Sequence, residues 1–200
     1  RALSQRNALL KRGYTVAKPQ IFVWNLRLSE LGGKIAAERT ALIEKFTGNA
    51  TETYRSLTNS KSEVFMRYRS PFPADQYESG LLKKLESNLE RDCLIGYTTI
   101  GPHRDDLLVE LNGKPAESSA SRGETRSLVL MLKKMELQML ETLHGSSPLF
   151  LLDDVFSELD GKRRHAITEH LQQYQTFITT TDADIVVKNF TKSSNVIALG

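Results

Sequence analysis

The chain has 200 residues, 40% of them hydrophobic and 26% charged, which is the composition of an ordinary water-soluble globular protein. Its single cysteine, Cys93, excludes an internal disulfide and favours a reducing, cytoplasmic compartment, and no apolar run approaches the roughly 18 residues of a membrane span. The net charge of +3 is uneven, because residues 1–70 carry 13 Lys and Arg against 5 Glu, a net of +8, and the remainder a net of −5. The basic part suits a nucleic-acid partner, with a solvated helix surface as the competing interpretation.

The first part of the chain is predicted to be a mainly α-helical arm over residues 1–93. A short helix over 1–13 precedes a long helix over about 20–46, in which Gly32-Gly33 is expected to lower stability or cause a bend. The long helix is indicated by a narrow apolar stripe with alternating spacings of three and four, broken only by Glu38. The stripe is formed by Ile21, Trp24, Leu28, Leu31, Ile35 and Leu42. The pattern then predicts a polar turn region, a strand and a returning helix, over residues 48–60, 63–69 and 77–89.

The second part, residues 94–200, alternates strands with helices. Residues 149–152 are continuously apolar, which is typical of a buried strand in a parallel sheet. The other predicted elements are strands over 97–100, 107–111, 176–179 and 196–199, helices over 124–143, 162–174 and 184–190, a hairpin turn at Asn112-Gly113 and a polar loop over 116–122. This alternation predicts an α/β lobe with a parallel sheet.

Two adjacent carboxylates, Asp153 and Asp154, directly follow the apolar strand. In open α/β sheets ligands bind beyond the carboxyl ends of the strands. One carboxylate there can hold Mg²⁺ against nucleotide phosphates, and a second can orient a water molecule. The competing interpretation is that the two acids only cap the turn after the strand.

A second group of residues opens the helix predicted over 124–143. Ser121 offers a hydroxyl, Gly123 lets a phosphate approach the backbone, and the helix N-terminus supplies free N–H groups and a partial positive charge. The same Ser-x-Gly pattern is also a common helix cap. A third motif, Ser157-Glu158-Leu159-Asp160, comes shortly after the paired carboxylates.

Together these motifs resemble the C-terminal lobe of ABC-type ATPases, where a signature motif, a Walker B strand and a D-loop follow one another in this order. Three further stretches are similar to the RecF family of SMC/ABC-type ATPases, namely residues 1–11, Gly101-Pro102-His103-Arg104-Asp105-Asp106 and Phe177-Ile178-Thr179-Thr180-Thr181. The resemblance implies an α/β fold, a partial ABC/SMC-like ATPase head consisting of the C-terminal lobe, joined to the mainly α-helical arm.

The resemblance also implies a function. RecF-like proteins bind DNA and act in recombinational repair and replication-gap repair together with recombination-mediator proteins. They use ATP and Mg²⁺, and they form an ATP-dependent homodimer with ATP between two heads. By this resemblance Asp153 would hold Mg²⁺ and Asp154 would position the attacking water.

The same resemblance assigns the remaining nucleotide-binding residues. Ser121 and Gly123 would reach the γ-phosphate of ATP held by the other protomer. Asp160 would lie at the dimer seam, and Thr180 or Thr181 would lie where related ATPases carry a residue that senses the γ-phosphate. Glu124 stands where the family usually has Gln, which places a carboxylate beside the expected γ-phosphate position.

The 200 residues contain no G-x-x-x-x-G-K-[ST] loop, which in the family lies upstream of the matching region. Because the first residue is also not Met, we expect the sequence to be part of a longer protein and to be inactive as an ATPase alone. Two other functions are considered. One is a non-catalytic module whose arm binds DNA or a partner. The other is a metal-dependent nuclease, for which the usual acids from several strands are not visible.

The long predicted helix offers four basic residues outside its apolar stripe as DNA contacts. These candidates are Arg27, Lys34, Arg39 and Lys45. Glu38 and Glu44 lie within a helical turn of some of them, so part of this charge is expected to be paired locally.

Overall fold

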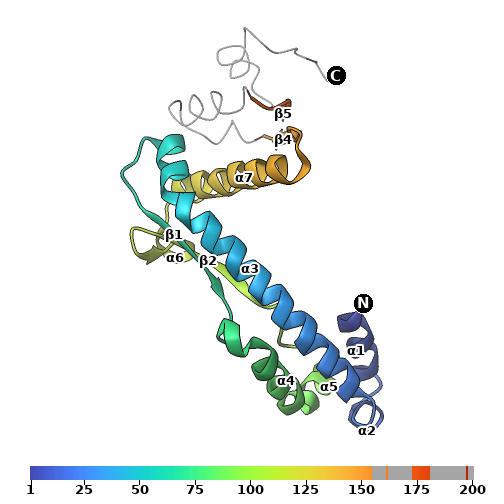
Figure 1. The fold of residues 1–200 in the computed structure, drawn as a ribbon. Helices are drawn as coiled ribbons and strands as arrows, with labels where there is room; N and C mark the ends of the chain where they lie inside the picture. Colours follow the sequence, from blue (N-terminus) through green and yellow to red (C-terminus); the bar gives the residue numbers. More distant parts are fainter. Residues whose placement is uncertain (155–160, 162–172, 181–196, 198–200) are drawn as a thin grey trace. The chain divides into compact units, whose positions relative to one another are not determined.

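The computed structural model describes residues 1–154, 161, 173–180 and 197 (Figure 1). The chain divides into two compact units, residues 1–47 with 66–108 (unit 1) and residues 48–65 with 109–200 (unit 2). The predicted division into an arm over 1–93 and a lobe over 94–200 stays a prediction. Several predictions fall outside the described residues, namely the elements over 162–174, 184–190 and 196–199 and the site residues Asp160 and Thr181.

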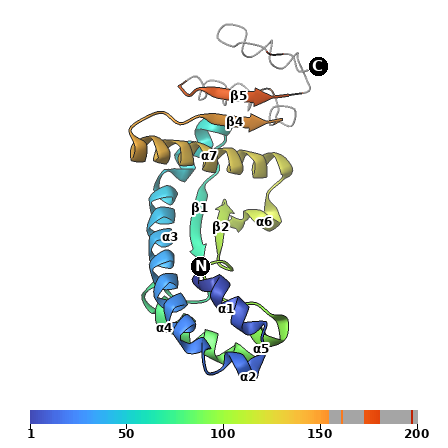
Figure 2. The same ribbon diagram turned by 90° about the vertical axis from the view of Figure 1, so that its right-hand side faces the viewer.

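Unit 1 is helical, as predicted for the first part of the chain. Its helices α1, α2, α4 and α5 pack around the first part of the long helix α3 (Figure 2). Their bounds are α1 Ala2–Leu10, α2 Tyr14–Ala17, α3 Ile21–Thr58, the short helix η1 Ala74–Gln76, α4 Tyr77–Ser87 and α5 Leu89–Ile95. Two apolar clusters form the core, one of Leu10, Ala17, Ile21 and Leu89 and the other of Ala36, Tyr77, Leu81 and Leu85.

The buried face of α3 differs from the predicted stripe. Ile35 and Leu42, two members of that stripe, are 42% and 37% exposed. The buried positions follow spacings of four, four, three and four, and only the first of them belongs to the predicted stripe. They are Ile21, Asn25, Ser29, Gly32 and Ala36. The prediction was wrong because small and polar side chains, rather than the large apolar ones, let a second helix approach closely.

Gly32 and Gly33 are the clearest case of this close approach. A Cβ added at Gly32 would lie 2.7 Å from Cδ2 of Leu81 in α4, and one added at Gly33 would lie 3.2 Å from Cβ of Glu78. Real Cβ atoms do not tolerate the first of these contacts. The glycine pair therefore allows α3 and α4 to pack, at the cost in helix propensity that the sequence predicts.

The helix α3 also continues through residues 48–58, where the composition predicts turns. Ala50, Tyr54 and Leu57 are buried at helical spacing, so this segment has an apolar face of its own. The hydroxyl of Thr58 donates to the carbonyl of Tyr54 at 2.8 Å, as threonines within helices do. Packing of this face overrides the weak helix propensity of the polar residues.

Arg6 is fully buried in unit 1 and joins its own helix, α1, to three others, α3, α4 and α5. Its Nη1 forms an ion pair with Oδ2 of the buried Asp92 at 2.7 Å and donates to the hydroxyl of Thr98 at 2.8 Å. Its Nε donates to Asn25 at 2.7 Å, and Nη2 to the carbonyl of Leu85 at 3.1 Å. A buried charge is tolerated only when it is paired and hydrogen-bonded in this way.

Residues 97–100, predicted as a strand, form no strand in the structure. Their polar groups bond to helices instead of to a neighbouring strand. The backbone N–H of Thr98 donates to Asn7 at 2.9 Å, and the backbone N–H of Thr99 donates to Asp92 at 3.2 Å. The β-branched composition was therefore a misleading signal, because side-chain acceptors take the place of a ladder.

A three-stranded sheet contains the two predicted strands around residues 63–69 and 107–111. Its order is β1, β2, β3, with bounds Val64–Arg69, Asp106–Leu111 and Lys114–Pro115. Strands β2 and β3 are antiparallel around Asn112 and Gly113, whose φ angles of 53° and 75° fit the two-residue turn predicted there. The polar loop expected after β3 contains the short helix α6, Ala116–Ser119.

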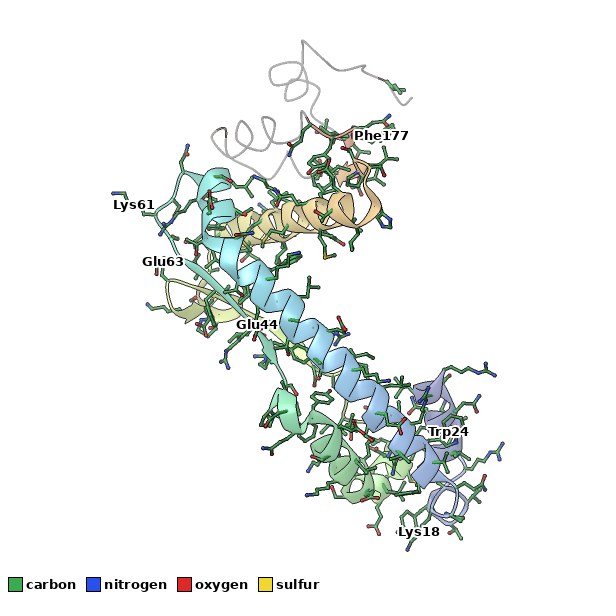
Figure 3. All side chains as sticks on the ribbon, in the orientation of Figure 1. Lys18, Trp24, Glu44, Lys61, Glu63 and Phe177 are labelled. Atoms are coloured by element: carbon green, nitrogen blue, oxygen red, sulfur yellow. The ribbon has the colours of Figure 1, made fainter. Side chains whose placement is uncertain are left out.

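Unit 2 contains the helix and the parallel strands predicted for the second part. Helix α7 spans Arg122–His144, β4 spans Phe150–Asp153 and β5 spans Thr176–Thr179. The two strands are parallel, with Leu151 opposite Phe177. These two side chains are 72% and 53% exposed, whereas Leu152 is buried. Figure 3 labels Phe177. One apolar face of this small sheet is therefore open, as we expect for part of a larger sheet.

No helix in the described part of the chain is both long enough and apolar enough to cross a lipid bilayer.

Candidate functional site

The carboxyl ends of β4 and β5 bring three of the candidate polar groups together. We call Asp153, Asp154 and Thr179 the carboxylate edge. Thr179 lies opposite Asp153 in the parallel register, and its hydroxyl donates to Oδ1 of Asp153. The same hydroxyl accepts a hydrogen bond from the backbone N–H of Asp154 at 3.2 Å. Within the described residues, Oδ2 of Asp153 makes no hydrogen bond, so one oxygen is held and the other is left for a ligand.

Asp154 turns the chain away from β4. Its φ angle is 50°, in the left-handed region that Asp tolerates better than most residues, and its N–H also donates to the carbonyl of Thr179 at 3.1 Å. The side chains of Asp153 and Asp154 are both exposed. Their separate roles, like the turn-capping interpretation, stay predictions.

Sequence reasoning missed Thr179, although it predicted the strand that ends there. It named Thr180 and Thr181 instead. Thr180 is half-buried, and Thr181 lies outside the described residues. The signal that identifies Thr179 is the register of two parallel strands, which places it opposite Asp153. This register cannot be deduced from the spacing along the chain.

The second group of candidate residues forms the start of α7, defined by Ser121, Gly123 and Glu124. Ser121 is the N-cap residue, and its hydroxyl donates to Oε2 of Glu124 at 2.7 Å. The backbone N–H of Ser121 donates to the same oxygen at 2.8 Å, and the N–H of Glu124 donates to the Ser121 hydroxyl at 3.3 Å. This is a complete capping box, so Glu124 stabilises the start of α7.

The start of α7 and the carboxylate edge come from different elements of unit 2, namely the N-terminus of one helix and the carboxyl ends of two parallel strands. Figure 2 shows β4 and β5 running alongside α7, with their arrowheads toward its yellow, N-terminal end. Each group presents polar atoms of the kind that bind phosphate or a hard metal ion.

The segment 101–106 lies in unit 1, apart from both of these groups in the division of the chain. Arg39 fixes it from α3, because Nη1 of Arg39 donates to the carbonyl of Pro102 at 2.6 Å. The Arg39 guanidinium also lies over the ring of Tyr68, 5.9 Å from its centroid. Arg39 thus has a structural role that the DNA-contact interpretation did not foresee.

The other three DNA candidates remain on the exposed surface of α3. Arg27 forms an exposed ion pair with Glu30 at 3.1 Å, one helical turn away. Lys34 and Lys45 make no hydrogen bond or ion pair within the part of the chain that the structure describes. These two lysines are the members of the predicted set with an unpaired charge, and the DNA role of all four stays a prediction.

No group of three His, Cys, Asp or Glu side chains that could hold a metal ion occurs among the described residues. The carboxylate edge has the smaller donor set of two carboxylates and one hydroxyl. These hard oxygen donors fit Mg²⁺, which usually takes one or two carboxylates and completes its shell with water and substrate phosphates. Asp153, with Oδ2 left open, is the residue that fits direct coordination.

Comparisons with known proteins identify the family. No protein-family model matches the sequence. The DNA replication and repair protein RecF of Ruminiclostridium cellulolyticum is 35% identical over 190 residues, which cover 91% of this chain and 51% of the relative. That of Halothermothrix orenii is 38% identical over 192 residues, covering 90% of this chain and 51% of the relative. The chain belongs to the RecF family. It spans about half the length of the curated relatives that it matches.

Two solved RecF structures support the fold. The recombination mediator protein RecF with ATPrS, from the RecFOR pathway, matches with a TM-score of 0.74 and 29% identity. The structure of RecF with ATP matches with a TM-score of 0.72 and 30% identity, and each match covers 92% of this chain and 51% of the RecF chain. The predicted fold, a partial α/β head with a mainly helical arm, is confirmed by this likeness.

Proposed function

We propose that this chain supplies, within an intact RecF protein, two separate half-sites for ATP, which meet only when two copies of the protein associate. The carboxylate edge is one half-site and the start of α7 is the other. The protein would use this nucleotide-dependent association to act on DNA in recombinational repair and replication-gap repair. Curated relatives named DNA replication and repair protein RecF, and RecF structures with ATP, support the assignment.

The polar groups of the two half-sites are the observation that carries the proposal. One half-site offers two carboxylates and a hydroxyl at the ends of parallel strands, and the other offers a hydroxyl and backbone N–H groups at a helix N-terminus. A symmetric pair of copies can bring the start of α7 of one copy to the carboxylate edge of the other, because a two-fold interface joins two different patches in both directions. The bound nucleotide would supply the triphosphate that both half-sites contact.

The two acids of the carboxylate edge would have different roles, one in binding the metal ion and the other in positioning water. Asp153, with Oδ1 held by Thr179, would hold Mg²⁺ through Oδ2. Asp154 would orient the attacking water and accept its proton. At the start of α7, Ser121 would donate its hydroxyl to a terminal phosphate oxygen once its bond to Glu124 is given up.

Unit 1 would bind the DNA. This unit carries 15 Lys and Arg against 10 Asp and Glu, a net of +5, whereas the whole chain has +3. Lys34 and Lys45 are the candidates on α3 whose charge is unpaired among the described residues. Contacts of this kind give sequence-independent attraction that weakens as salt rises. Recombination-mediator proteins are the expected partners, since the related RecF structures are described as part of the RecFOR pathway.

A mixing experiment in the intact protein tests the two-copy site. One variant carries Asp154→Asn and the other Ser121→Ala, and each alone is expected to hydrolyse ATP poorly. In a mixed dimer one of the two sites has both half-sites intact, so random mixing should restore about a quarter of the wild-type rate. Failure of the mixture to exceed either single variant would show that the half-sites do not act across two copies.

A second function, a non-catalytic arm that binds DNA or a partner, is favoured by the net charge of unit 1 alone. The two functions differ in what nucleotide does. If ATP has no effect on association or on DNA binding of the intact protein, the chain acts as a binding module. The 200-residue chain by itself is expected to show no appreciable ATPase activity under either function, because it has no phosphate-binding loop.

A further inference from the structure

Unit 1 contains an open cleft of about 520 Å³ between residues 69–71 and 103–106. We propose that this cleft binds a phosphodiester group of nucleic acid, with the Arg104 guanidinium as the principal contact. The residues that line it include none of the carboxylate edge, the start of α7 or the four basic candidates on α3. The proposal rests on the proposed function in one respect, because in both the protein binds nucleic acid.

The cleft wall formed by residues 101–104 has a fixed backbone. The N–H of Arg104 donates to the carbonyl of Gly101 at 2.8 Å, and Arg39 donates to the carbonyl of Pro102 at 2.6 Å. Gly101 has a φ of 128°, a conformation that residues with a Cβ rarely adopt. Nε2 of His103 lies 3.2 Å from the carbonyl of Thr98, to which it donates. The wall is thus held before any ligand arrives, which lowers the entropy cost of binding.

The two acids of the cleft are already satisfied by other groups. Oδ2 of Asp105 accepts hydrogen bonds of 2.5 Å from the hydroxyls of Tyr68 and Tyr77. Burial is the main cause that raises the pKa of both tyrosines, and their bonds to Asp105 add to it, so both remain protonated donors. Asp105 therefore anchors the segment from within.

Asp106 is paired across the cleft. Its Oδ2 forms an ion pair with Nη2 of Arg69 at 2.5 Å, and its Oδ1 accepts from the N–H of Leu107 at 2.8 Å. The Arg69 guanidinium is the main cause that lowers the pKa of Asp106, so its negative charge is balanced at neutral pH. Asp106 is therefore balanced by a cation, whereas Oδ2 of Asp105 is occupied by two neutral tyrosine hydroxyls.

Arg104 is the other arginine of the cleft, and its charge is not used in these pairs. Its guanidinium lies over the ring of Tyr97, 5.3 Å from the centroid, and makes no hydrogen bond or ion pair within the described part of the chain. Stacking on an aromatic ring orients the planar group while leaving its N–H donors free. These donors match the paired oxygens of a phosphate.

Nucleic acid fits the cleft better than an acidic protein segment for two reasons. The surrounding unit carries a net charge of +5, which attracts an extended polyanion. Tyr97, beside the guanidinium, is 45% exposed and offers a ring face to a nucleotide base. A single carboxylate of a protein segment would bind the guanidinium, but neither the net charge of the unit nor the ring of Tyr97 would add to its affinity.

Fluorescence anisotropy of the intact protein with short labelled duplex and single-stranded DNA at low salt tests the proposal. Arg104→Gln removes the contact, and Arg12→Gln removes an equal charge from an exposed position of unit 1 outside the cleft. We expect Arg104→Gln to weaken binding about fivefold and to reduce the slope of log affinity against log salt by about 0.9, one phosphate contact. Arg12→Gln should change both far less, and Arg104→Lys should fall between.

Equal effects of Arg104→Gln and Arg12→Gln on DNA binding would overturn the cleft assignment while leaving the proposed function in place. If the wild-type protein binds no DNA at low salt, the DNA part of the proposed function fails instead. A titration with inorganic phosphate, followed by the NMR chemical shifts of residues 103–106, then shows whether the cleft binds free phosphate. Shifts would assign the cleft to free phosphate, and their absence would overturn an anion site altogether. Binding of an acidic peptide that depends on Arg104, without DNA binding, would also contradict the proposal.

Discussion

Thr179 and Asp153 are joined side chain to side chain across two parallel strands, the threonine hydroxyl donating to Oδ1 of the aspartate. Because the hydroxyl also accepts from the N–H of Asp154, one small side chain contacts the carboxylate of Asp153 and the backbone of Asp154. A carboxylate held through one oxygen presents the other in a fixed direction. Groups that orient a metal ligand in this way contribute to its affinity although they do not touch the metal.

Thr179→Val should weaken Mg²⁺-dependent nucleotide binding by the intact protein about 10- to 100-fold, the usual range for such supporting groups. The valine keeps the size and branching of the side chain but cannot donate to Asp153. Thr179→Ser is the matched control, because it keeps the hydroxyl. Calorimetric titrations at several Mg²⁺ concentrations measure the effect, and equal affinities for the valine and serine variants would assign Thr179 a packing role only.

Asp154→Asn in the intact protein should slow ATP hydrolysis by about 10²- to 10⁴-fold while leaving nucleotide binding largely unchanged. The amide keeps the shape of the carboxylate but cannot accept a proton from water. Asp153→Asn should instead lower Mg²⁺-dependent binding. Single-turnover hydrolysis and equilibrium binding measured on both variants separate the two roles, and an equal loss of binding in both would contradict them.

Gly32→Ala should destabilise the chain by about 1–3 kcal/mol, because the new methyl group meets Leu81 at 2.7 Å in a packed interface. Gly48→Ala is a control within the same helix, where a Cβ would meet no atom within 4 Å. There alanine should stabilise by about 0.5–1 kcal/mol, since it lowers the entropy of the unfolded chain. Urea unfolding compares the two, and effects of the same sign would contradict the close packing of α3 on α4.

Arg6→Met should cost about 3–5 kcal/mol, because it leaves the buried carboxylate of Asp92 without its ion pair. The double variant Arg6→Met/Asp92→Leu removes both charges and should recover part of the loss. The unfolding midpoints of the single and double variants measure this. A double variant less stable than Arg6→Met would mean that the hydrogen bonds that Thr99 donates to Asp92 matter more than the ion pair.

Replacing basic residues on α3 by Glu should separate charge from structure. Lys34→Glu/Lys45→Glu in the intact protein should weaken DNA binding and lower its salt dependence by about 0.9 per lost phosphate contact, with little change in melting temperature. Arg39→Glu should lower the melting temperature as well, because it removes the bond to Pro102. Anisotropy and thermal melting on each variant test this, and unchanged DNA affinity in the double variant would exclude α3 as a DNA surface.

The sequence was most informative where a pattern is local. The helix that begins after Ser121, the turn at Asn112-Gly113 and the parallel strand before Asp153 each follow from neighbouring residues, and each is found as predicted. Local rules suffice there because caps, turns and short apolar runs are decided within a few positions.

The predictions that failed depend on contacts between distant residues. The buried face of α3 is set by the approach of α4 near Gly32, and the irregular path of residues 97–100 by acceptors on Asn7 and Asp92. Periodicity ranks large apolar residues as core, so it overlooks small and polar residues at a close helix crossing. The role of Thr179 was not predicted for the same reason, since its partner Asp153 is 26 positions away.

The buried pairing of Arg6 also bears on how the protein is made. Its partners Asp92 and Thr98 lie 86 and 92 positions further along the chain. At translation rates of about 5–20 residues per second, the ribosome needs roughly 5–20 seconds to synthesise that interval. During this time the guanidinium stays hydrated, and α1 has no anchor to hold it against α5. A nascent chain therefore passes through a period in which its first helix is open to chaperones and proteases, and this exposure ends only after Thr98 has left the exit tunnel.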